Sequence, residues 1–130
     1  MRVKSLSAVV VGLTVLMGST AFAQALPRPV GDLAAGQKAF EAKCRACHKE
    51  GGVGGPMAPD LRGVYGRASG KASFNRYSAN MKTGKIVWTQ QALDTYLQGP
   101  SKVVPGTIMA IAPVAPADRK NIIAYMATLK

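Results

Sequence analysis

The stretch Cys44-Arg45-Ala46-Cys47-His48 decides how this sequence is interpreted, because it holds both cysteines and the single histidine of the chain. A thioredoxin-like redox disulfide expects a strand before the motif and a βαβ setting. Here a helix-like segment precedes the motif and a glycine-rich segment follows it, which is the opposite arrangement. A closed zinc site expects four ligands, more than the chain's cysteines and histidine supply. Neither a redox disulfide nor a zinc site explains the motif well.

The histidine directly after the second cysteine indicates covalent haem attachment. Two thiols three positions apart can reach the two vinyl groups on one edge of a porphyrin. The imidazole of the next residue can then lie under the ring and meet the iron. The motif therefore predicts one haem c per chain, attached covalently through Cys44 and Cys47, with His48 as an axial ligand.

The first residues of the chain have the features of an export signal. A basic start precedes a mostly apolar run from Leu6 to Met17, and Ala21-Phe22-Ala23 is a small-x-small cleavage site. The apolar run is shorter than the roughly 20 residues that cross a bilayer. We therefore expect a signal peptide at residues 1–23, cleavage after Ala23, and one domain at residues 24–130. A periplasmic location without stable membrane insertion follows.

The chain is strongly basic, with 17 Lys and Arg residues against 6 Asp and Glu residues. Such a surface can attract nucleic acid, anionic lipid or acidic proteins. The sequence has no long run of like charges, and export argues against a nucleic-acid partner. Electrostatic steering toward acidic protein surfaces fits best. The lysines expected near a docking surface are Lys43, Lys102 and Lys49.

Capping and stop signals predict an all-α chain with three main helices. Asp32 and Thr89 are the expected N-caps of the first two helices. Gly99-Pro100 stops the second helix, and Pro116 suits the first turn of the third. The intervening stretches are rich in Gly and Pro and predict long loops, suited to wrapping a flat cofactor. The expected helices span residues 32–44, 89–98 and 116 to 128 or 129.

A six-coordinate iron needs a second axial ligand, which must be a methionine or a lysine because His48 is the only histidine. Met126 lies on the apolar stripe of the last predicted helix, where core packing is expected. Met57 is too close to the motif to cross the ring, and Met81 is ambiguous. Met109 follows a stiff turn that can hold its thioether over the far face.

Residues 24–130 as a whole resemble class I cytochrome c, in the short bacterial form that is similar to mitochondrial cytochrome c. The resemblance implies a class I cytochrome c fold: about three main helices, short helical turns and long loops around one haem. It also implies that the first and last helices cross at Gly36, Phe40 and Tyr125. The matching pieces, in family order, are Gly36–Phe40, Cys44–His48, Pro59-Asp60-Leu61 with Gly63, Gly66-Arg67, Tyr77-Ser78, Trp88, Tyr96-Leu97, Pro105–Met109 and Ile123-Ala124-Tyr125.

The resemblance also implies a role for each matching site residue. His48 and Met109 would be the axial pair, which raises the reduction potential relative to two histidines. Pro59 would accept a hydrogen bond from the proton-bearing ring nitrogen of His48. Tyr96 would donate a hydrogen bond to the sulfur of Met109. Arg67, Tyr77 and Trp88 would contact the haem propionates, and Ser78 is a further expected cofactor-binding residue.

The sequence departs from the family pattern beside Met109. Ile108 stands where many relatives carry a lysine, Ile111 replaces an aromatic residue and Pro113 replaces a glycine. We therefore expect a rim that is less basic and more aliphatic than in the mitochondrial protein. The expected partners are redox proteins with acidic docking faces: a membrane cytochrome complex, an oxidase, or a periplasmic dehydrogenase or reductase.

The predicted function is that of a soluble, exported, monomeric carrier of single electrons and not of an enzyme. Two alternatives remain open at this point. A five-coordinate haem enzyme or gas-binding protein requires that Met109 does not bind the iron. A thiol–disulfide oxidoreductase requires reactive thiols at Cys44 and Cys47 and no haem absorption.

Overall fold

The structure is a computed structural model that describes residues 25–130. The predicted signal peptide and its cleavage site lie outside the described residues. Residues 25–130 form helices and loops, and their strand-like pairing is limited to an isolated bridge between Ala68 and Val87. The elements are α1 (Leu33–Lys43), α2 (Arg45–His48), η1 (Glu50–Gly52), α3 (Ala79–Lys82), α4 (Gln90–Gln98), α5 (Pro100–Val103) and α6 (Pro116–Met126).

The three longest helices confirm the three predicted ones, and they begin at the predicted signals. Asp32 caps α1, with its Oδ1 accepting from the backbone N–H of Ala35 at 2.9 Å. Thr89 caps α4 in the same way, with its Oγ1 accepting from the N–H of Ala92 at 3.1 Å. Pro116 occupies the first turn of α6. Such caps satisfy N–H groups that have no partner within the helix.

Two helix boundaries differ from the prediction. α6 ends at Met126 and not at Thr128 or Leu129. Both the N–H and the hydroxyl of Thr128 bond the carbonyl of Tyr125, at 2.9 and 2.7 Å, which tightens the last turn and ends the α-helical pattern. Pro100, expected only to stop α4, begins the short helix α5, since proline suits a first helical turn.

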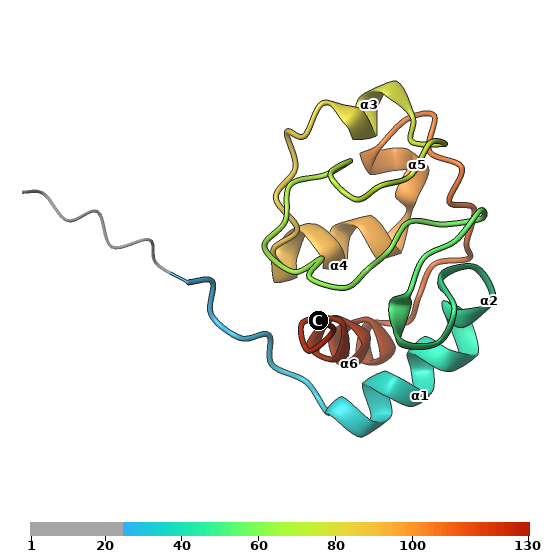
Figure 1. The fold of residues 1–130 in the computed structure, drawn as a ribbon. Helices are drawn as coiled ribbons and strands as arrows, with labels where there is room; N and C mark the ends of the chain where they lie inside the picture. The colour runs from blue at the N-terminus through green and yellow to red at the C-terminus, as the bar shows by residue number, and fades with distance from the viewer. Residues whose placement is uncertain (1–24) are drawn as a thin grey trace, which may run out of the picture.

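The first long helix, α1, crosses the last one, α6 (Figure 1). Phe40 of α1 is fully buried, and its ring centroid lies 5.4 Å from that of Tyr125 on α6. Gly36 is buried one turn away on α1. Aromatic pairs at this distance add to the stability that burial alone provides. The crossing predicted at these three residues is confirmed.

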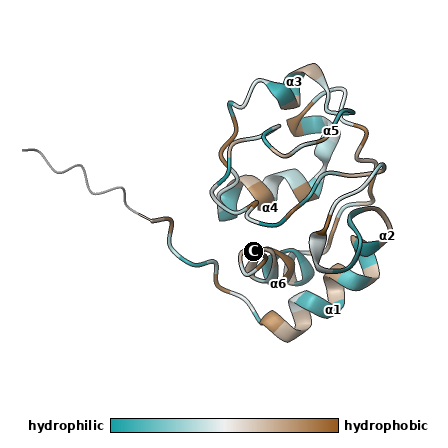
Figure 2. Ribbon diagram, in the orientation of Figure 1, coloured by the Kyte–Doolittle hydropathy of each residue, from teal (hydrophilic) through white to brown (hydrophobic). Residues whose placement is uncertain are grey.

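The remaining elements surround an interior that the long loops complete. In Figure 1, α1 and α6 lie at one end of the molecule, α3 and α5 at the other, and α4 between them. Figure 2 shows hydrophobic residues along α6 and on α4. These two helices supply seven buried side chains of the core, namely Leu93, Tyr96, Leu97, Ile122, Ile123, Ala124 and Met126. No helix between residues 25 and 130 has the length and apolar character needed to cross a membrane.

Candidate cofactor site

A cavity of about 500 Å³ opens inside the core, walled by α2, α4, α6 and the long loops. Pockets for small molecules and cofactors commonly hold about 300–1,000 Å³ and are mostly apolar with a few placed polar groups. Every residue that the sequence predicts to bind a cofactor lines this cavity. These residues are Cys44, Cys47, His48, Pro59, Arg67, Tyr77, Ser78, Trp88, Tyr96 and Met109.

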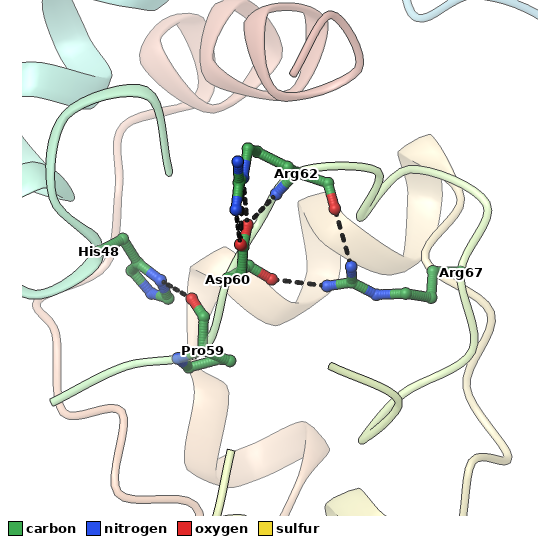
Figure 3. A network of polar contacts seen from close by, with 5 residues as sticks. All are labelled: His48, Pro59, Asp60, Arg62 and Arg67. Atoms are coloured by element: carbon green, nitrogen blue, oxygen red, sulfur yellow. Dashed lines mark hydrogen bonds and ion pairs between the residues drawn. The ribbon is translucent and has the colours of Figure 1, made fainter. Parts of the chain in front are cut away.

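His48 ends α2 and is 6% exposed. Its Nδ1 lies 2.9 Å from the carbonyl oxygen of Pro59, as predicted (Figure 3). A carbonyl can only accept, so Nδ1 carries the proton and Nε2 keeps its lone pair. Burial lowers the pKa of His48, against the opposite effect of the bond to Pro59. The ring is therefore held neutral, the form that can coordinate a metal.

The two thiols lie at the wall of the same cavity. Cys44 is the residue between α1 and α2 and is half-buried, while Cys47 within α2 is exposed. Burial raises the pKa of the Cys44 thiol to about 11, although the charge of Lys43 opposes the effect. A thiol that stays protonated at neutral pH is a poor nucleophile. Residues 25–130 also contain no group of three His, Cys, Asp or Glu side chains that could hold a metal ion.

Met109 lies half-buried on the loop that connects α5 to α6. Its N–H donates to the Oγ1 of Thr107 at 3.3 Å, and the same Oγ1 lies 3.2 Å from the hydroxyl of Tyr96 on α4. The sequence predicted that Tyr96 bonds the sulfur of Met109, whereas its hydroxyl pairs with Thr107. Thr107 also lines the cavity. Thr107 was not among the predicted site residues. The sequence did hold a signal for its role, because a Thr hydroxyl often accepts from the backbone N–H two residues later, which here is that of Met109.

The other methionines at the cavity differ in their burial. Met126 of α6 is buried in the hydrophobic cluster, as predicted, and Met81 of α3 is buried there too. Met57 is 60% exposed. The Nη1 of Arg76, which also lines the cavity, lies 4.0 Å from its sulfur. Met57 therefore lies at the mouth of the cavity.

Trp88 and Ser78 connect the cavity wall to the surrounding helices. Trp88 is buried, and its ring centroid lies 5.0 Å from that of Tyr96. Ser78 caps α3, with its Oγ accepting from the N–H of Met81 at 3.2 Å. The contact with Tyr96 orients Trp88, and the cap orients the Ser78 hydroxyl.

Arg67 makes bonds that sequence reasoning did not anticipate. Its Nη1 donates to the carbonyl of Arg62 and its Nη2 to the carbonyl of Asp60, each at 2.8 Å (Figure 3). Tyr77 lies near enough that the charge of Arg67 lowers its pKa, although burial, the larger effect, raises it. The phenol of Tyr77 is therefore a neutral donor at the cavity wall.

The rim of the cavity on the Met109 side carries little charge. Residues 103–117 contain no charged side chain, and Ile108 among them is 46% exposed. The Nζ of Lys43, which lines the cavity, lies 3.5 Å from Oδ2 of Asp118. Part of its charge is thus compensated. The exposed cation next to this stretch is Lys102, on α5.

A family model, curated proteins and solved structures all relate this chain to cytochromes c. A family model described as "Cytochrome c" matches residues 33–130. Cytochrome c of Euglena viridis is 45% identical over 101 residues, which cover 77% of this chain and 99% of that protein. The "Cytochrome c-type cyt cy" of Rhodobacter capsulatus is 43% identical over 100 residues, which cover 76% of this chain and 50% of that protein. The solved structure of cytochrome cH from Methylobacterium extorquens superposes with a TM-score of 0.66 at 39% identity, covering 74% of this chain and 97% of that one.

Proposed function

The chain belongs to the cytochrome c family of electron carriers, and on that premise we propose that it is an exported single-electron carrier with His48 and Met109 as axial ligands. It carries one covalent haem c, because its single domain has one Cys44–His48 attachment motif. The three main helices and short turns form the cytochrome c fold.

The residues at the cavity fit a haem. They bring a thiol pair, an unprotonated imidazole nitrogen and a thioether to one largely apolar space of about 500 Å³. When bound, haem iron gains and loses one electron. The observation that carries the proposal is that His48 keeps Nε2 free while Met109, from a distant part of the chain, lines the same cavity.

The chain's own residues hold both proposed ligands in place. The carbonyl of Pro59 fixes the tautomer and the direction of the His48 ring. Thr107, bonded to Tyr96, accepts from the backbone of Met109. Ligands positioned in this way need to move little when charge arrives or leaves, which favours fast electron transfer over binding of a new ligand.

We also propose that partners dock at the mouth of the cavity. The uncharged stretch 103–117 would meet an apolar centre, and Lys102 would meet an acidic border on the partner. Such complementarity orients short-lived complexes at high association rates. The basic start and apolar run of residues 1–23 support export to the periplasm and cleavage after Ala23. The exported protein would be a monomer.

Spectroscopy of the purified protein tests this function. We expect that acid acetone leaves the colour on the polypeptide and that the ferric spectrum is low-spin with a weak near-infrared sulfur-to-iron band. A high-spin ferric spectrum without that band would instead favour a five-coordinate enzyme or gas-binding protein. Complete extraction of the colour would contradict covalent attachment. Intact mass after export reports the cleavage site.

A further inference from the structure

Asp60 and Arg62 form an ion pair directly beside the peptide that orients His48 (Figure 3). The Nε of Arg62 lies 3.1 and 3.0 Å from the two carboxylate oxygens of Asp60, and its Nη2 donates to Oδ2 as well. Oδ1 of Asp60 also accepts the backbone N–H of Arg62 at 2.8 Å. One carboxylate thus closes a tight turn through both side chain and backbone.

Arg67 binds the same turn through its backbone. Its guanidinium donates to the carbonyls of Asp60 and Arg62, at 2.8 Å each. The turn at residues 60–62 therefore has hydrogen bonds to the Asp60 carboxylate, to the N–H of Arg62 and to both carbonyls. Rotation of any peptide in this turn breaks at least one of these bonds.

The turn at residues 60–62 is linked to the His48 hydrogen bond by one peptide group. The carbonyl of Pro59 and the N and Cα atoms of Asp60 belong to the same planar unit, so a displacement of Asp60 also displaces that carbonyl. The carbonyl of Pro59 accepts from Nδ1 of His48 at 2.9 Å. A single peptide group therefore separates the surface pair from the hydrogen bond to the buried ring.

We propose that Asp60 and Arg62 are positioning residues for His48. Their ion pair holds the carbonyl of Pro59 in line with Nδ1, and so sets the strength of the hydrogen bond behind the ring. The inference rests on the proposed axial role of His48. The side chains of Arg62 and Asp60 are 46% and 31% exposed, and such pairs add little to global stability. Their effect is therefore expected at His48 and not in the unfolding of the whole domain.

The test compares hydrogen exchange of the His48 Nδ1–H in the reduced, haem-loaded protein, followed by NMR. Asp60→Asn keeps the size of the side chain and removes its charge, and Arg62→Gln removes the other partner. We expect each variant to exchange roughly 2- to 10-fold faster than the wild type, the range for a weakened hydrogen bond. The double variant should exchange no faster than the faster single variant, because both substitutions break the same contact.

Asp94→Asn is the matched control. Asp94 on α4 accepts from Arg119 at 2.8 Å, its side chain is 39% exposed, and it does not line the cavity. This variant should exchange like the wild type. The inference is overturned if both Asp60→Asn and Arg62→Gln exchange at the wild-type rate. It is also overturned if Asp94→Asn exchanges as fast as they do. Either result can occur while the ferric wild-type spectrum is low-spin, so it leaves the proposed function standing. A high-spin ferric spectrum of the wild type would instead overturn the role of Met109 and leave this inference standing, because the inference needs only His48 on the iron.

Discussion

Gly36 lies directly against the backbone of Asn121, so that a Cβ atom on Gly36 would be 2.1 Å from the Asn121 carbonyl oxygen. No real Cβ contact is that short, and the obstacle is backbone that cannot rotate away. Gly36→Ala should force α1 and α6 apart and lower the free energy of unfolding by roughly 1–3 kcal/mol, as overpacked cores do. Urea unfolding of the haem-loaded protein measures the loss. Ala35→Ser, on the exposed neighbour, should stay within about 0.5 kcal/mol of the wild type.

Met109→Ala should remove the thioether from the iron while leaving the attachment at Cys44 and Cys47 intact. We expect the near-infrared sulfur band to disappear. The reduction potential should fall by roughly 100–300 mV, a part of the ~0.8 V range that axial ligands span. Potentiometric titration measures it. Met57→Leu alters another methionine at the cavity and should keep both the band and the potential, and equal effects of the two variants would count against Met109.

Ile108→Lys should place a positive charge on the uncharged rim. Oxidation of the reduced protein by the anion hexacyanoferrate(III) should become about 3-fold faster at low salt, because opposite charges attract across about 10 Å of water. The gain should largely vanish at 1 M salt, where the screening length is about 3 Å. Stopped-flow absorbance gives both rates. Gln91→Lys adds the same charge on α4, outside the cavity, and an equal gain there would show that net charge alone is responsible.

Arg62 donates to the carboxyl of Asp60 and holds its pKa below its ordinary value. The unfolded chain therefore binds the proton more readily than the folded one, and stability decreases as the pH falls from about 4 toward the lower folded-state pKa. At pH 7 the free energy of unfolding of the wild type should exceed that of Asp60→Asn by less than about 1 kcal/mol, since the pair is partly exposed. The two free energies of unfolding should converge in acid. Urea titrations at a series of pH values measure this, and a constant difference down to pH 2 would contradict it.

The sequence predicted the parts of this fold that depend on local signals. Asp32, Thr89 and Pro116 mark helix starts because capping involves neighbouring residues, and the attachment motif is five consecutive residues. Contacts between distant segments were predicted only where a resemblance supplied them, as at Phe40 and Tyr125.

The sequence could not predict which partner a polar side chain chooses when several lie within reach. Tyr96 bonds Thr107 and not the sulfur of Met109. Arg67 bonds two backbone carbonyls of a loop whose path no local rule determines. The ion pair of Asp60 with Arg62 had a signal, opposite charges two residues apart, but that spacing places side chains together only in a turn of this shape.

The cavity has a consequence for the order in which this protein is assembled. Its walls include core residues such as Leu97 and Met126, so the interior cannot pack at normal density until haem fills the space. The core around this space is therefore completed only when haem is present. A Cys44→Ser, Cys47→Ser chain is accordingly expected to show weak helical circular dichroism and broad thermal unfolding.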